Sequence, residues 1–311
     1  MKFSVFADIH YCPGVFMSGD EAHLDMIQKR AEAENSEFII HAGDFCHGPG
    51  RENVADYLKK YNDFHIPSYH CLGNHDTDGT SYAETLEKYN MPDGHYCFDH
   101  NGYRMIVCDP NYYLLDGVYY HYDLGNYYKH GELRDYMPPE QLEWLKETIE
   151  SSPYPCILIS HESFERDQGG VKNMKAVQKI INDANKAKPH SVIMCINGHH
   201  HRDYIRILDN VIYFDLNSAS YDWLGKTHTL YPASLCREYR NLNHTVVYND
   251  PIHAVITLEE KPEIGGIAVT IDGMESEMFL GIQREMTGNP KCDGCGRPVT
   301  PVVQSAKFIL C

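Results

Sequence analysis

The sequence lacks any run of about 18 apolar residues, the length that a membrane-spanning helix needs. It also lacks the charged, apolar and small-residue regions of a secretory signal peptide, because residues 1–8 already have the pattern of a strand. Hydrophobic residues still make up 42% of the 311 residues, enough for a large folded core. These features predict a globular cytoplasmic protein with no membrane partner.

Positive charge is also scarce. The chain has 27 Lys and Arg residues against 44 Asp and Glu residues, and its formal net charge is −17. Nucleic-acid-binding proteins usually carry clustered Lys and Arg, so extended nucleic acid is not the expected partner. Bound metal ions could still reverse the sign of the field locally.

The cysteines do not form a recognisable disulfide framework. Their number, 11, is odd, and several lie inside apolar runs, as expected for small buried side chains in a reducing compartment. Only Cys292 and Cys295 have the spacing of a metal site, and the second pair of a zinc ribbon is missing. Cys311 or a second chain could complete such a site.

Apolar segments alternate with helical ones through most of the chain, which predicts an α/β fold with parallel strands. The expected strands of this pattern are 2–7, 37–42, 67–72, 155–160 and 191–196, and the expected helices are 20–34, 53–64, 80–89, 139–150 and 173–186. Hairpins are expected at 96–108, around Asn101-Gly102, and at 204–216, around Asp209-Asn210. Further strands are expected at 254–258 and 267–271.

Residues 111–136 interrupt this pattern with many tyrosines and no clear period, which predicts an insertion. Two interpretations remain open. The segment is either a loop that packs its own aromatic side chains, or a rim that stacks on a substrate base or ring.

Residues of the types that commonly bind metals follow five of the expected strands. These residues are Asp8 and His10, Asp44, Asn74 and His75, His161, and His199 and His201. Each has an ordinary explanation by itself, such as helix capping, a turn, or a hydrogen-bonded histidine in the core. Together they predict one site, because ligands bind at the carboxyl ends of strands in open α/β sheets.

Imidazole and oxygen donors in this mixture suit two divalent or transition-metal ions, with manganese, iron and zinc as candidates. In an extended segment, alternate side chains lie on the same face, so Asp8 and His10 should share one face. For the same reason His199 and His201 should share a face, and His200 should point away from them. Two ions about 3.5 to 4 Å apart can hold a hydroxide and clamp a phosphoryl group.

Taken in order, the motifs resemble those of the calcineurin-like metallophosphoesterase superfamily. The motifs that carry the resemblance are Asp8-Ile9-His10, Gly43-Asp44, Gly73-Asn74-His75-Asp76, His161 and Gly198-His199-His200-His201. The resemblance implies a four-layer α-β-β-α sandwich of two mixed sheets flanked by helices.

It further implies that Asp8, His10 and His201 bind one metal, that Asn74, His161 and His199 bind the other, and that Asp44 bridges them. His75 would be the catalytic residue outside the ligand set, contacting the phosphate and protonating the departing oxygen. On this basis residues 1–285 form the catalytic domain, and residues 286–311 form an accessory tail with Cys292 and Cys295.

The motifs depart from the protein-phosphatase branch of the family. The Asp-Arg-Gly that follows the second motif there is missing after Asp44, and Asp76 stands where that branch has Glu. The sequence therefore looks more like the small-molecule and cyclic-nucleotide phosphodiesterases. The expected activity is hydrolysis of a small, nucleotide-like or other organic phosphomonoester or phosphodiester by metal-bound hydroxide. A nuclease and a non-catalytic metal-stabilised binding module are the alternatives, and the sequence leaves the oligomeric state open.

Overall fold

Two six-stranded mixed sheets form the centre of the protein. The computed structural model describes residues 1–17, 20–50, 54–225, 227–288 and 298–311. In the first sheet β1, β2 and β3 are parallel, and β14, β15 and β18 are antiparallel to their neighbours. Its order is β18 (Ala306–Leu310), β15 (Gly266–Asp272), β14 (Ala254–Lys261), β1 (Lys2–Phe6), β2 (Ile39–Ala42) and β3 (Ser68–Cys71).

In the second sheet the four central strands are parallel, and the two edge strands are antiparallel to their neighbours. Its order is β10 (Tyr204–Leu208), β11 (Val211–Asp215), β9 (Val192–Asn197), β8 (Cys156–Ile159), β5 (Tyr103–Val107) and β4 (Tyr96–His100).

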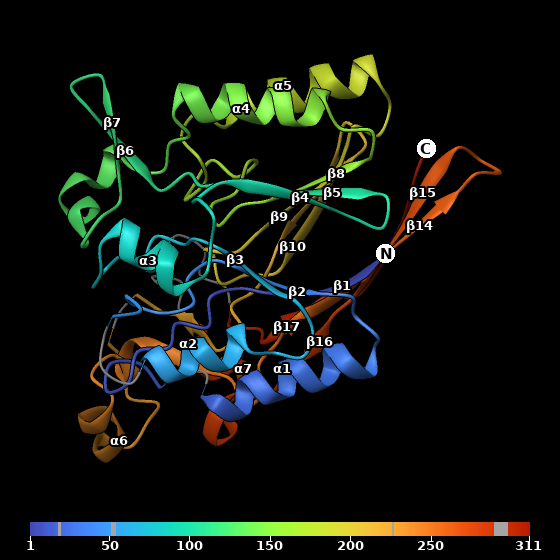
Figure 1. Cartoon of the computed structure of the whole chain (residues 1–311). Helices are drawn as coiled ribbons and strands as arrows, with labels where there is room; N and C mark the ends of the chain where they lie inside the picture. The colour runs from blue at the N-terminus through green and yellow to red at the C-terminus, as the bar shows by residue number, and fades with distance from the viewer. Residues whose placement is uncertain (18–19, 51–53, 226, 289–297) are drawn as a thin grey trace.

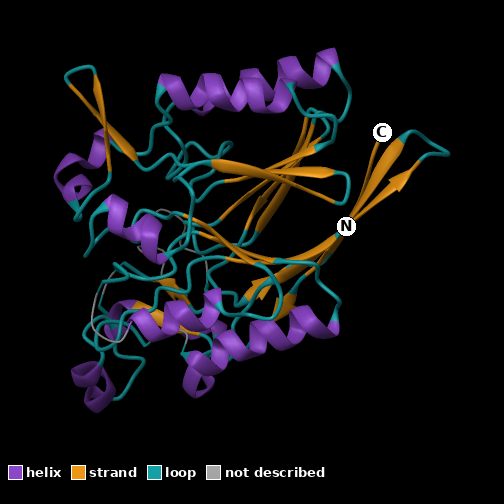
Figure 2. Cartoon of the chain, in the orientation of Figure 1, coloured by secondary structure: helices purple, strands orange, loops and turns teal. Residues whose placement is uncertain are grey.

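Helices cover the outer face of each sheet (Figures 1 and 2). The α-helices are α1 (Glu21–Ala33), α2 (Val54–Asn62), α3 (Tyr82–Lys88), α4 (Pro139–Glu150), α5 (Met174–Ala187), α6 (Ala233–Glu238) and α7 (Arg284–Thr287). Short 3₁₀ helices are η1 (Asn126–Leu133), η2 (Leu242–His244) and η3 (Phe279–Gly281).

The central strands are apolar on both faces because both faces are covered. In β1, Val5 belongs to the core between the sheets, whereas Phe6 packs with residues of α1 and α2. In β8, Ile159 belongs to the core between the sheets, whereas Leu158 packs with residues of α4 and α5. Successive strand residues point to opposite faces, so the alternation builds three layers of packing. The predicted four-layer α-β-β-α arrangement is thereby confirmed.

Turn chemistry accounts for the hairpins. Asn101-Gly102 and Asp209-Asn210 have positive φ at both turn positions, as a tight two-residue hairpin requires. A third hairpin, β6 (Tyr112–Leu115) and β7 (Val118–His121), lies inside the tyrosine-rich insertion and turns at Asp116-Gly117, again with positive φ at both residues. The prediction of a loop missed this hairpin, although its Asp-Gly signal is present in the sequence.

The C-terminal segment joins the body of the protein. β18 pairs with β15 at the edge of the first sheet, and β17 (Val302–Val303) pairs with β16 (Met274–Glu275). In another short pair, β12 (Tyr221–Trp223), the next strand after β11 in sequence, pairs with β13 (Thr245–Val247). Cys292 and Cys295 lie outside the described residues, and the accessory role of residues 286–311 stays a prediction. Among the described residues, no helix is long and apolar enough to cross a membrane.

Candidate metal centre

The predicted ligands converge where the parallel strands of both sheets end. β1, β2 and β3 lead into Asp8, Asp44 and Asn74, while β8 and β9 lead into His161 and His199. A cavity of about 660 Å³ opens over this point. Its lining includes His10, Asp44, Asn74, His75, His199 and His201, and the fully buried Asp8 and His161 complete the predicted set.

One group of ligand atoms consists of Asp8, His10 and His201. Asp8 Oδ1 lies 3.3 Å from His201 Nε2 and 3.6 Å from His10 Nε2, and the two imidazole nitrogens are 3.0 Å apart. All three side chains are buried, and their atoms are close enough to bind one cation.

A second group consists of Asp44, His161 and His199, with Asn74 beside it. His161 Nε2 lies 3.0 Å from Asp44 Oδ2, and His199 Nδ1 lies 3.0 Å from Asn74 Oδ1. The carboxylate of Asp44 also faces the first group, because the same Oδ2 atom is 3.7 Å from His10 Nε2. One carboxylate oxygen is therefore shared between the two groups, as a bridging ligand requires.

The buried histidines are oriented by backbone carbonyls. His161 Nδ1 donates to Ala42 O and His201 Nδ1 donates to Tyr221 O, each at 3.0 Å. These bonds leave each Nε2 directed into the site, as is usual for metal-binding histidines. His161 Nε2 is buried and meets the geometry of no hydrogen bond, although the carboxylate of Asp44 lies 3.0 Å away, so a cation between the two groups would satisfy both.

The strand ends turn sharply to present these side chains. Asp8, His10, Asp44, His199 and His201 all have positive φ, between 50° and 70°. Non-glycine residues rarely adopt this conformation, and it concentrates at functional sites. Glycine is required beside them: a Cβ on Gly198 would lie 2.4 Å from Asp8 Oδ2.

The electrostatics of the site favour bound positive charge. Burial alone would raise the pKa of Asp8 and Asp44, but neighbouring imidazoles, chiefly His161, hold both pKa values below their ordinary range. Burial lowers the pKa of His10 to about 3 and also lowers that of His199. Burial would lower the pKa of His161 too, but Asp44 and Asp8 raise it. Metal binding needs ionised carboxylates and neutral imidazoles, so Asp8, Asp44, His10 and His199 already favour the required forms, whereas a metal at His161 would displace a proton.

Asp76 holds the loop that carries Asp44. Its carboxylate accepts hydrogen bonds from the backbone amides of Gly73, Asp44, Phe45 and Cys46 at 2.7 to 3.1 Å, and from Tyr89 Oη at 2.6 Å. The backbone amide of His75 donates in turn to Asp44 Oδ1 at 2.7 Å. The second and third motifs therefore fix each other's geometry.

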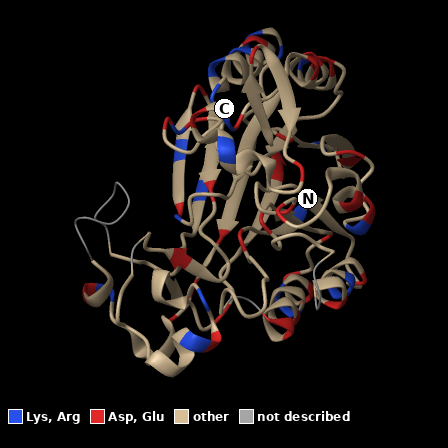
Figure 3. Ribbon diagram, turned by 90° about the vertical axis from the view of Figure 1, so that its left-hand side faces the viewer, with Lys and Arg blue, Asp and Glu red and all other residues tan. Residues whose placement is uncertain are grey.

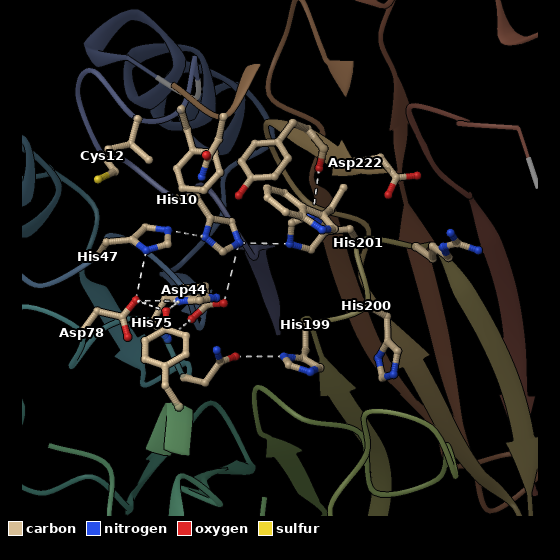
Figure 4. A pocket seen from close by; sticks show the side chains of 18 of the residues that line it. His10, Cys12, Asp44, His47, His75, Asp78, His199, His200, His201 and Asp222 are labelled. Atoms are coloured by element: carbon tan, nitrogen blue, oxygen red, sulfur yellow. Dashed lines mark hydrogen bonds and ion pairs between the residues drawn. The ribbon is translucent and has the colours of Figure 1, made fainter. Parts of the chain in front are cut away.

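A chain of hydrogen bonds links His75 to the first group of ligands. Asp78 Oδ2 lies 2.7 Å from His75 Nδ1 and 3.2 Å from His47 Nδ1, and His47 Nε2 lies 3.1 Å from His10 Nδ1 (Figure 4). Burial alone would lower the pKa of His75, but Asp44 and Asp78 raise it, so its protonated form is favoured.

Tyrosines of the insertion complete this network. Tyr127 Oη donates to Asp78 Oδ1 and Tyr128 Oη donates to Asp78 Oδ2, both at 2.8 Å, and Asn74 Nδ2 donates to Tyr127 Oη at 3.3 Å. His47, His75 and Asp78 could by distance hold a third cation. The carboxylate of Asp78 already has four donors, however, which indicates a positioning role.

The seven candidate ligands and His75 that the sequence predicts all lie at this point, and their roles stay a prediction. His47, Asp78, Tyr127 and Tyr128 also contact the site, although the sequence predicts no role for them. His47 and Asp78 each stand three residues after a predicted site residue, which is the signal that could have found them. His200 follows the prediction that it points away from its neighbours: its Nε2 donates to Gln168 O at 2.6 Å (Figure 4). Within the insertion, Tyr113, Tyr122 and Tyr127 pack together, as the first interpretation predicts, and Tyr128 lines the cavity. Stacking of the insertion on a substrate stays a prediction.

Comparison with known proteins identifies the family of this chain. The family model described as calcineurin-like phosphoesterase matches residues 1–203. The chain therefore belongs to the calcineurin-like phosphoesterase family, whose members use dinuclear metal centres.

Solved structures with the same fold include a dimetal phosphatase from Danio rerio. It is 14% identical, covers 90% of this chain and 99% of its own, and superimposes with a TM-score of 0.62. The GAP50 anchor of the inner membrane complex of Plasmodium is also 14% identical, with 83% and 84% coverage and a TM-score of 0.50. At these identities the similarity shows the fold alone. No curated protein matches the sequence.

Proposed function

We propose that this protein is a dinuclear-metal-dependent phosphohydrolase acting on a small phosphate ester. The observation that carries the proposal is the shared carboxylate of Asp44, whose Oδ2 faces His161 Nε2 and His10 Nε2 from two separate ligand groups. Two divalent ions held there supply Lewis-acid activation of water and of the phosphoryl group.

In this proposal Asp8, His10 and His201 hold one ion, and Asn74, His161 and His199 hold the other. His75 contacts the phosphate or protonates the departing oxygen. Asp78 supports that role geometrically, because it accepts the Nδ1 proton of His75 and leaves Nε2 as the donor toward substrate.

The proposed substrate is nucleotide-like or another small organic phosphate, in the cytoplasm. A cavity of about 660 Å³ has room for a small organic ester. In Figure 3, Lys and Arg are interspersed with Asp and Glu instead of forming a continuous basic band, which disfavours the nuclease alternative.

The test is turnover of bis(4-nitrophenyl) phosphate and 4-nitrophenyl phosphate by the purified protein with added Mn²⁺. We expect turnover that EDTA abolishes and Mn²⁺ restores, and the ratio of the two rates assigns diesterase or monoesterase activity. Asp44→Asn should remove it, since this variant loses the shared carboxylate.

A metal-loaded, folded protein that hydrolyses neither ester would support the binding-module alternative. Preferential cleavage of single-stranded or duplex DNA over both aryl esters would support the nuclease. Either result would contradict the proposal.

A further inference from the structure

The cavity continues past the ligand groups along an aromatic wall. Tyr221 lies 5.2 Å from the His10 ring between centroids, and Phe16 stacks on Tyr221 at 5.3 Å and an interplanar angle of 11°. Trp223 meets the edge of Phe16 at 6.1 Å. A substrate whose phosphate sits at the metals would extend its remaining atoms along this wall.

Three arginines line the same cavity, and they differ in their partners. Arg166 forms an ion pair with Asp215 at 3.3 Å and lies over the Tyr204 ring. The side chains of Arg202 and Arg240 make no ion pair or hydrogen bond with any residue that the structure describes. Arg166 therefore has a structural role, whereas the other two guanidinium groups are available to a ligand.

Both unpaired arginines are placed by neighbouring structure. Arg202 directly follows His201, so its Cα lies about 3.8 Å from that of a candidate ligand. The backbone amide of Arg240 donates to Gly14 O and that of Asn241 to Val15 O, which holds this segment beside Phe16. The two residues thus reach the cavity from separate parts of the chain.

The two arginines place positive charge at a cavity of an acidic protein. The chain has a net charge of −17, and most of its other arginine and lysine contacts are with nearby carboxylates. Guanidinium groups bind carboxylate and phosphate through paired hydrogen bonds. The lining also includes Asp222, so the two guanidinium groups would act on an anionic ligand through direct contact more than through the overall charge of the cavity.

We propose that Arg202 and Arg240 form a subsite for a second anionic group of the substrate, a carboxylate or a further phosphate, at the end remote from the scissile ester. The inference rests on the proposed function and deepens it. It assigns the substrate to the organic phosphates that carry two separated anionic groups.

The experiment uses three non-hydrolysable inhibitors of equal chain length: butylphosphonate, 4-phosphonobutyrate and propane-1,3-bisphosphonate. Their far ends are a methyl group, a carboxylate and a phosphonate. The inhibition constant of each compound is measured against hydrolysis of the aryl ester that the Mn²⁺-loaded protein turns over. Wild type, Arg202→Gln, Arg240→Gln and the double variant are compared, with Arg237→Gln as the control. Arg237 is exposed, lies three residues before Arg240 and is outside the described lining of the cavity.

We expect wild type to bind one of the two doubly anionic inhibitors more tightly than butylphosphonate. Each substitution in the subsite should reduce that preference by about 10-fold to 100-fold, the range of a hydrogen bond to a charged group. Butylphosphonate should bind all variants equally, and Arg237→Gln should behave as wild type. The preferred inhibitor identifies the second group as carboxylate or phosphate.

Chelation of Mn²⁺ by the inhibitors is the same for every variant, so it cancels in the comparison. Equal affinity of wild type for all three inhibitors, or a preference that survives in the double variant, would overturn the subsite. Absence of aryl ester turnover would instead count against the proposed function, and inhibitor binding would then be measured by calorimetry on the metal-loaded protein.

Discussion

The Nδ1 atom of His75 lies 2.7 Å from Oδ2 of Asp78, and the same carboxylate oxygen is 3.2 Å from His47. A carboxylate on one imidazole nitrogen fixes the tautomer and directs the other nitrogen outward. The position of His75 is therefore set by a side chain outside the two ligand groups of Asp8 and Asp44. Chemistry and metal assembly can be separated by mutation.

His75→Ala should keep both metals and lose about 10²-fold to 10⁴-fold in turnover, the range for general acid or electrostatic assistance. The loss should be greatest for alkyl esters, because an alkoxide needs protonation as it departs and a nitrophenolate needs less. Rates for the two leaving-group classes and metal content by elemental analysis are the measurements.

Asp78→Asn provides the companion variant. Asp78→Asn should also lower turnover, as His75→Ala does, with the metal content unchanged. The asparagine keeps the shape of the side chain and removes the charge that orients His75. Equal slowing of both ester classes by His75→Ala would assign phosphate binding instead of proton donation. Loss of a metal would show that the ligand assignment is wrong.

Metal stoichiometry tests the division into two groups. The purified protein should bind two transition-metal ions per chain at this site, and His199→Ala should weaken binding of one of them. His200→Ala is the matched control, because the neighbouring imidazole bonds to Gln168 O instead of facing the ligand groups. The count is made in a variant without Cys292 and Cys295.

A saturated stoichiometry of one that does not change when Asn74 or His161 is replaced would rule out the two-metal assignment. If His199→Ala and His200→Ala weaken metal binding equally, the side chain of His199 has no special role in the site, and the ligand geometry described above is wrong.

The C-terminal segment should contribute to stability and leave catalysis unaffected. Replacing Cys292 and Cys295 with serine should leave metal-dependent turnover largely intact. Leu310→Ala should lower the free energy of unfolding by about 2 to 5 kcal/mol, because Leu310 is buried in β18 against the core between the sheets. Urea denaturation and turnover of the folded variants measure the two effects. Loss of turnover in a folded, fully metallated double serine variant would refute the accessory role.

An ion pair anchors the tyrosine-rich insertion to the second sheet. His121 Nε2 lies 2.6 Å from Asp109 Oδ2, just beyond β5. Burial alone would lower the pKa of His121, but Asp109 raises it above 6.5. A raised folded-state pKa gives stability that is present below the unfolded pKa and lost as pH rises through the folded value.

The stability difference between wild type and His121→Gln should therefore shrink as the pH rises above the ordinary pKa of histidine, about 6.5, through the raised folded-state pKa. Urea unfolding at several pH values measures it, with the exposed His65→Gln as the control. A difference that stays constant across this range would show that His121 contributes through packing on Tyr82 and not through charge.

Local sequence was sufficient for every strand of the two large sheets except β18, and for naming the candidate ligands. Val5 and Phe6 pack on opposite faces of β1, and Asp8 lies two residues further on. The run of hydrophobic residues therefore identifies the strand, and the position of Asp8 at its end identifies the candidate ligand. The hairpin at Asn101-Gly102 was predicted in the same way, from turn chemistry that acts over a few residues.

Tertiary structure decided which distant segments meet. Tyr127 reaches Asp78 from an insertion some 50 residues away, and Arg240 reaches the cavity because its backbone bonds to Gly14. β18 joins the first sheet although it lies at the far end of the chain from β1. Such contacts depend on how the two sheets pack and on which backbone groups remain to be paired, and no local period or spacing in the sequence encodes them.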